Sequence, residues 1–97
     1  MKLRFTPRAV EDLAAIGDHI RSKNPAAAVR VRAAILETLQ MLLLFPHAGR
    51  KQTVEGVRKI VTRRYAYIVY YSLDLDLQEV VVGSIQHPAR KREYSDV

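Results

Sequence analysis

The apolar residues in the first half of the chain recur with the period of an α-helix. A short stretch before them, Lys2–Phe5, is expected to form a strand. Thr6 can cap the helix that follows, with Pro7 at its first position, and this helix should run to about Ser22. One face of it is apolar and consists of Val10, Leu13, Ile16 or Gly17, and Ile20. This spacing predicts an amphipathic helix that turns one side toward a core.

A second helix is predicted directly after the first. Asn24 followed by Pro25 repeats the capping pattern, and Pro46 ends the helix because proline cannot continue one. One face between these residues is apolar and carries Ala28, Val31, Ile35, Leu39 and Leu42. Since the break between the two helices is short, we expect them to pack antiparallel as a hairpin.

Beyond Pro46 the period of the apolar residues changes from about 3.6 to about 2, which is typical of strands. The turns Arg63-Arg64 and Asp74–Leu77 should separate three strands, Val57–Thr62, Ala66–Leu73 and Glu79–Ile85. Such close spacing favours an antiparallel meander. The expected fold class is α+β in the order β-α-α-β-β-β, with the helical hairpin packed on one face of a small, mainly antiparallel sheet. The other face should remain accessible, followed by a short polar tail, His87–Val97.

Length and composition limit the class of protein. The 97 residues fit a single domain, residues 1–97. There is no Cys, which excludes disulfides and thiolate metal sites. The N-terminus has no apolar segment of a secretory signal, and the apolar run Met41–Phe45 is far too short to span a membrane. We therefore expect a cytoplasmic protein that does not engage a membrane.

The net charge of +6 is concentrated in the middle of the chain. Residues 1–49 hold seven basic and four acidic residues, and residues 65–97 hold three basic and five acidic ones. Against the single acidic residue Glu55, the segment 50–64 carries Arg50, Lys51, Arg58, Lys59, Arg63 and Arg64. Such a patch attracts polyanions or an acidic protein partner, although a basic face that is merely solvated has the same composition.

Several side chains have both a structural and a functional interpretation. Arg58 lies in a predicted strand among partly buried residues, where a charge needs a partner or a function. His87 stands alone at a strand end, where a histidine is more often structural than functional. Three tyrosines share the middle strand, so some must pack in the core: Tyr67, Tyr70 and Tyr71.

No cofactor or metal site is expected. The three histidines, His19, His47 and His87, do not have the spacing of metal ligands. The chain has no glycine-rich phosphate loop. Gly49 and Gly56 are instead expected to allow backbone turns.

In their order and spacing, short segments along nearly the whole chain resemble the ParE/RelE superfamily of bacterial toxins. The segments are Phe5-Thr6-Pro7 with Ala9 and Asp12-Leu13, then Asn24-Pro25-Ala26-Ala27, Phe45-Pro46, Gly49-Arg50, Gly56-Val57-Arg58, Tyr67-Ile68-Val69-Tyr70, and Ile85-Gln86-His87 with Arg90. The resemblance implies the toxin component of a type II toxin–antitoxin module.

The resemblance is closer to the ParE branch, whose members block DNA gyrase by binding it and need no catalytic residue. It implies a hetero-oligomer with a cognate acidic antitoxin, ParD-like and joined to a ribbon-helix-helix DNA-binding part. Interfaces favour exposed basic and aromatic groups. The residues implied in binding the partner or target are Arg50, Arg58, Arg63, Arg64, Tyr67, His87 and Arg90.

Two alternatives remain open at the level of sequence. Members resembling RelE cut messenger RNA in the ribosome, which without a metal requires a base, an acid and cations. Such a set could come from Arg58, Lys59, His87, Arg90 and Tyr94, but Tyr67 and Pro88 stand where the nuclease pattern usually has arginine. The second alternative is a non-toxic RNA-binding module whose tyrosines stack on bases.

Overall fold

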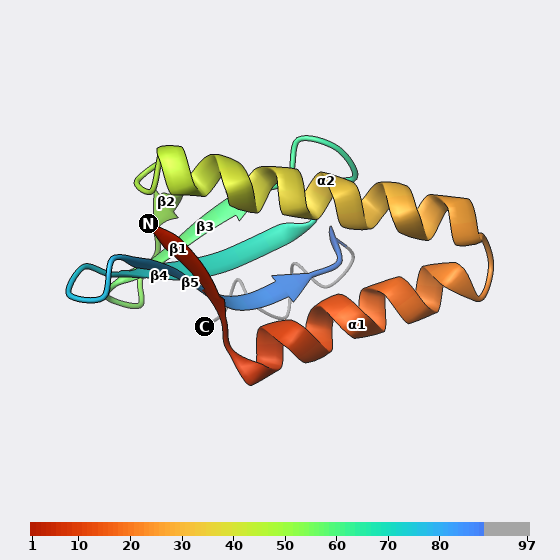
Figure 1. Cartoon of the computed structure of the whole chain (residues 1–97), viewed down its shortest axis with the longest axis horizontal. Coiled ribbons are helices and arrows are strands. Elements are labelled where there is room, and N and C mark those ends of the chain that lie inside the picture. Colours follow the sequence, from red (N-terminus) through yellow and green to blue (C-terminus); the bar gives the residue numbers. More distant parts are fainter. Residues whose placement is uncertain (89–97) are drawn as a thin grey trace.

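Two helices and five strands are formed by residues 1–88, the part of the chain that the computed structural model describes (Figure 1). In chain order they are β1 (Lys2–Phe5), α1 (Pro7–Arg21), α2 (Pro25–Leu44), β2 (Arg50–Lys51), β3 (Val57–Val61), β4 (Ile68–Asp74) and β5 (Glu79–Gln86). The predicted order is confirmed, and β2 is an addition to it. With two residues, β2 is too short to show any periodicity in the sequence.

Each helix begins at the cap that the sequence predicts. The Oγ1 of Thr6 accepts a hydrogen bond from the Ala9 N–H at 3.1 Å and donates one to the Gly83 carbonyl at 2.9 Å. The Oδ1 of Asn24 accepts from the Ala27 N–H at 3.1 Å. Thr6 therefore both starts α1 and ties its first turn to β5. Neither helix within residues 1–88 is long and apolar enough to cross a membrane.

The two helices form an antiparallel hairpin that covers one face of the sheet (Figure 1). The predicted apolar face of α2 is buried throughout, but Val10 of α1 is 56% exposed. The prediction for Val10 was wrong because the buried stripe passes through Ala9, which is fully buried. Ala9, Leu13, Ile16 and Ile20 follow the helical repeat, and Val10 is rotated from that stripe by about 100°.

The sheet has the strand order β1-β5-β4-β3-β2. β1 runs parallel to β5, and the other neighbours are antiparallel, so the predicted meander is confirmed within a mixed sheet. A bulge shifts the register of β4 and β5, because Tyr70 pairs with Ser84 whereas Tyr71 pairs with Val82. The middle strand starts later than predicted, because Ala66 has a positive φ of 54° that extended backbone does not adopt.

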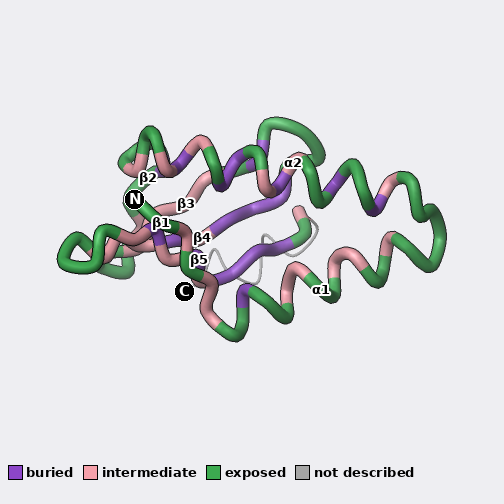
Figure 2. The backbone as a smooth tube through the Cα atoms, viewed as in Figure 1, coloured by how far each residue is buried: buried purple, intermediate pink, exposed green. Residues whose placement is uncertain are grey.

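The core lies between the hairpin and the sheet, and Figure 2 shows the buried residues along the inner side of α2 and on the central strands β4 and β5. Val69 and Ile85 pair on the core face, so their neighbours Ile68, Ser84 and Gln86 lie on the other face. These three residues are nevertheless buried, whereas Val61 is 45% exposed. The second face is therefore accessible only in part, contrary to the sequence-based expectation.

Candidate functional site

A network of hydrogen bonds joins the loop after α2, residues 46–49, to the middle of the sheet. Tyr71 belongs to the buried core, and its hydroxyl donates to the Pro46 carbonyl at 2.8 Å and accepts from the Gly49 N–H at 2.8 Å. Arg58 stands opposite Tyr71 on β3. Its Nη1 donates to the carbonyls of Gly49 and His47, at 2.8 and 3.2 Å. Together the two side chains fix this loop, which we call the 46–49 loop.

Glycine is required at position 49 because Tyr71 lies against its backbone. A Cβ atom there would stand 2.6 Å from both Cε1 and Oη of Tyr71 and 3.0 Å from the Lys59 carbonyl. The chain bends at Gly49, as expected, but of these two glycines only Gly56 has a positive φ, so the close approach of Tyr71 is what requires glycine at position 49. At Gly56 φ is 79°, and the turn predicted there is confirmed.

The two buried tyrosines are held in their neutral form. Burial raises the pKa of the Tyr71 phenol above its ordinary value, and the Gly49 hydrogen bond and the nearby Arg58 charge lower that pKa by smaller amounts. Burial also raises the pKa of Tyr67. At neutral pH the Tyr71 hydroxyl therefore keeps the proton that it donates to the 46–49 loop.

Like charges face each other across β2 and β3. Arg50 pairs with Lys59, and Lys51 pairs with Arg58. Neighbouring residues of a strand point to opposite faces, so Lys51 and Arg58 lie on the face of Tyr71 and the other pair lies on the second face. None of these four cations takes part in an ion pair within residues 1–88. The basic segment seen in the sequence thus becomes a sheet edge with unneutralised cations on both faces.

The rest of the basic segment forms a separate exposed turn between β3 and β4. Thr62 shapes it, because its Oγ1 donates to the Arg64 carbonyl at 2.6 Å and accepts from the Tyr67 N–H at 2.9 Å. Arg63 and Arg64 are both exposed, and the Arg64 guanidinium carbon lies 5.6 Å from the centre of the Tyr65 ring. β3 ends at Val61, so at about 3.3 Å per residue the turn that carries Arg63 begins roughly 10 Å along the sheet from Arg58.

Tyr67 and His87 pack together at the end of the core. Tyr67 is 4% exposed, and the His87 ring meets it edge-on, with the ring centres 5.4 Å apart and the planes at 86°. Tyr67 therefore offers almost no surface to a partner, whereas His87 is exposed. In the nuclease pattern an arginine usually precedes the segment that corresponds to Ile68-Val69-Tyr70. In this chain that position is Tyr67, which belongs to the core.

The described residues of the possible nuclease set are not brought together. Arg58 and Lys59 are adjacent on β3 and project to opposite faces of the sheet. His87 packs against Tyr67 at the other end of the core. Arg90 and Tyr94 lie outside the described residues, so their predicted roles remain predictions.

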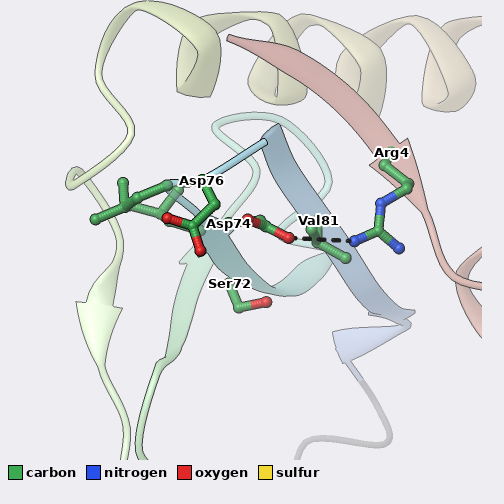
Figure 3. A pocket seen from close by; sticks show the side chains of 7 residues that line it. Arg4, Ser72, Asp74, Asp76 and Val81 are labelled. Carbon is green, nitrogen blue, oxygen red and sulfur yellow. Dashed lines mark ion pairs between the residues drawn. The ribbon is translucent and has the colours of Figure 1, made fainter. Parts of the chain in front are cut away.

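A hollow of about 460 Å³ opens near the β4–β5 turn, on the face away from the helices (Figure 3). Within the described part of the chain, Arg4 is the only basic residue in its lining. The Nε of Arg4 is 2.9 Å from Glu79 Oε1, and its Nη2 is 3.9 Å from Asp74 Oδ2, the ion pair drawn in Figure 3. Asp76 adds another carboxylate to the lining. This hollow is therefore internally neutralised and disfavours an acidic ligand.

Two contacts that position the site were not foreseen from the sequence. The Tyr71 hydroxyl and the Gly49 N–H are 22 residues apart in the chain. Asp12 accepts a hydrogen bond from the Ile85 N–H at 3.0 Å, across 73 residues, and so anchors α1 on β5. Lys51 was counted in the basic segment but not chosen as a site residue, because only the register of β2 reveals that it faces Arg58.

Two helices packed on one face of a five-stranded mixed sheet form the architecture of the toxins of bacterial toxin–antitoxin systems. The chain is similar to a chain of the chromosomal ParDE system from P. aeruginosa, with a TM-score of 0.76 and 28% identity, covering 90% of this chain and 95% of that chain. It is also similar to the isolated E. coli RelE toxin, with a TM-score of 0.69 and coverage of 98% and 92%. At 23% identity, the second likeness shows the fold alone.

Sequence comparison identifies the branch. The model of the family described as ParE toxin of type II toxin-antitoxin system, parDE, matches residues 3–92. A protein of Sinorhizobium fredii named "Putative toxin Y4kP" is 32% identical over 81 residues, which is 84% of this chain and 84% of that protein. The chain belongs to the ParE family of type II toxins.

Proposed function

We propose that this protein arrests growth in the cytoplasm by binding and poisoning DNA gyrase, and that a cognate acidic antitoxin neutralises it. The observation that carries this proposal is the ParE-family match over residues 3–92. Members of this branch act by binding gyrase, so the protein needs a surface and no catalytic group.

The geometry of the described residues supports binding over cleavage. Cleavage of a phosphodiester builds negative charge on the phosphate, and removing one preorganised donor from such a site costs roughly 2.7–4 kcal/mol. In this chain the position of one expected arginine is the core residue Tyr67, and that of another is Pro88. Arg58 and Lys59 lie on opposite faces of the sheet. A poison that acts by binding does not need these donors or a common face for Arg58 and Lys59.

The surface also suits the proposed antitoxin. Basic residues line the β2–β3 edge and the β3–β4 turn, and single apolar residues such as Val10 and Val29 are exposed on the two helices. A disordered acidic segment that becomes ordered on binding can use both kinds of contact. Its affinity should fall as salt rises, because exposed charge pairs are screened. We propose a ParD-like antitoxin that joins such a segment to a ribbon-helix-helix part.

Controlled expression in bacteria tests the proposal. Induced cells should form filaments and show DNA damage while bulk messenger RNA stays intact, and coexpression of the adjacent gene should restore growth. Tyr94→Phe should retain toxicity and His87→Ala should at most weaken target binding, because a poison that acts by binding needs no acid or base. Ribosome-dependent cuts within codons that either substitution abolishes would instead establish a RelE-like nuclease.

A further inference from the structure

A second hollow, of about 450 Å³, opens between the β2–β3 turn and the β4–β5 turn, beside the 46–49 loop. Its lining includes the cross-strand pair Lys51 and Arg58, together with Leu73 and Leu75. Among residues 1–88, Glu55 is the one acidic residue in its lining, and it forms no ion pair with either cation. We call this hollow the basic pocket.

Arg58 enters the basic pocket in a fixed orientation with donors to spare. An arginine side chain has five N–H donors, and the two bonds to the 46–49 loop both come from Nη1. The Nε and Nη2 atoms have no hydrogen-bond partner among residues 1–88. These two atoms form the planar edge that binds a carboxylate through two parallel hydrogen bonds. Because the guanidinium is already held, a ligand loses little affinity to ordering it.

Lys51 adds a second cation at the same place. It stands directly opposite Arg58, and like charges in that position destabilise the strand pair. The hollow around Arg4 differs, since Asp74 and Glu79 neutralise its cation. A bound anion would relieve the repulsion in the basic pocket and has no such role around Arg4.

Apolar side chains in the lining of the basic pocket indicate what carries the anion. Leu73 and Leu75 both line the pocket, and Leu75 is 61% exposed. A phosphate backbone would gain nothing from these side chains. A protein segment can place a carboxylate on the cations and an apolar side chain on Leu75.

From this geometry we infer that the basic pocket receives an aspartate or glutamate side chain of the antitoxin, next to an apolar residue that packs on Leu75. The identity of the partner rests on the proposed function, whereas the carboxylate chemistry rests on Arg58 and Lys51 alone.

The test measures the affinity of the purified protein for the product of the adjacent gene by titration calorimetry. Lys51→Ala removes an exposed cation, and Arg58→Lys keeps the charge but loses the planar edge. Each should weaken binding about tenfold or more, as expected for the loss of a charge-assisted hydrogen bond. Lys23→Ala is the matched control, because it removes the same charge from an exposed residue in the turn between α1 and α2. It should change the affinity less than about twofold, a surface effect.

A second arm keeps the inference separate from the identity of the partner. The peptide acetyl-Leu-Glu-Leu-Glu-Leu-amide, titrated into ¹⁵N-labelled protein, should shift the amide signals of Lys51, Gly56 and Leu75. The same peptide with Gln in place of Glu should not. If the antitoxin binds but Lys51→Ala and Arg58→Lys behave like the control, the pocket assignment is wrong and the toxin–antitoxin pairing stands. If the product of the adjacent gene does not bind, the toxin–antitoxin pairing is wrong. The peptide shifts then decide by themselves whether the basic pocket binds a carboxylate.

Discussion

Replacing Tyr71 with Phe removes one oxygen atom from the interior and should cost about 2–3 kcal/mol of the free energy of unfolding. The substitution leaves the buried Gly49 N–H without its acceptor and the Pro46 carbonyl without its donor. An unsatisfied buried group costs about 1–3 kcal/mol, and the ring itself still fills its place. For a domain of this size, each kcal/mol lowers Tm by roughly 4–8 °C. The 46–49 loop should loosen, and Arg58 with it.

Urea unfolding followed by circular dichroism measures this effect. Tyr65→Phe is the control, because Tyr65 is 42% exposed and its ring remains available to Arg64. The control should differ from the wild type by less than about 0.5 kcal/mol, as is usual for surface changes. If Tyr71→Phe is equally mild, the hydroxyl does not hold the 46–49 loop and the account of that loop is refuted.

Three further predictions follow from the same region. Gly49→Ala should destabilise by about 1–3 kcal/mol through overpacking against Tyr71, and an unchanged urea midpoint would refute the close approach. Arg58→Ala should weaken growth arrest while the protein still folds; a variant without a cooperative thermal transition would assign Arg58 a structural role only. The pKa values of Tyr67 and Tyr71 are raised in the folded state, so their contribution to stability is fully present below about pH 10 and is lost as pH rises through the folded pKa values. Urea midpoints between pH 8 and 11 should therefore fall more steeply for the wild type than for a Tyr67→Phe variant.

Features encoded within a few residues could be predicted from the sequence. Thr6-Pro7 and Asn24-Pro25 place the caps that start both helices, and the spacing of apolar residues places the buried face of α2. Val10 was misplaced because the apolar face of α1 can be drawn through either Val10 or Ala9. In the fold Ala9 is fully buried against the core and Val10 is exposed. Which of the two residues faces the core depends on how α1 packs on the other elements, and the sequence of one helix does not specify that packing.

Features that depend on register could not be predicted. The bulge opposite Tyr70 and Tyr71 breaks the alternation of β5, so Val80, Val82 and Ile85 all face the core despite their uneven spacing. Without that register the sequence does not say which tyrosines are buried. The parallel place of β1 beside β5 likewise depends on a pairing between the two ends of the described chain.

The candidate site was foreseen in its composition and not in its arrangement. Arg58 was identified as a charge that needs a partner, and its partners are backbone carbonyls of the 46–49 loop. Because every residue has a backbone carbonyl, the sequence does not show which ones bind Arg58. The segment that looks like one basic patch is divided by the length of β3 into the β2–β3 edge and the Arg63-Arg64 turn.

The central claim, that this ParE-family toxin acts by binding gyrase, is tested most directly by DNA supercoiling with purified components. The protein should inhibit supercoiling by gyrase in proportion to its concentration, and the product of the adjacent gene should restore it. In a parallel reaction, ribosomes programmed with messenger RNA should leave that RNA intact. Unimpaired supercoiling together with ribosome-dependent cleavage of the RNA would contradict the claim.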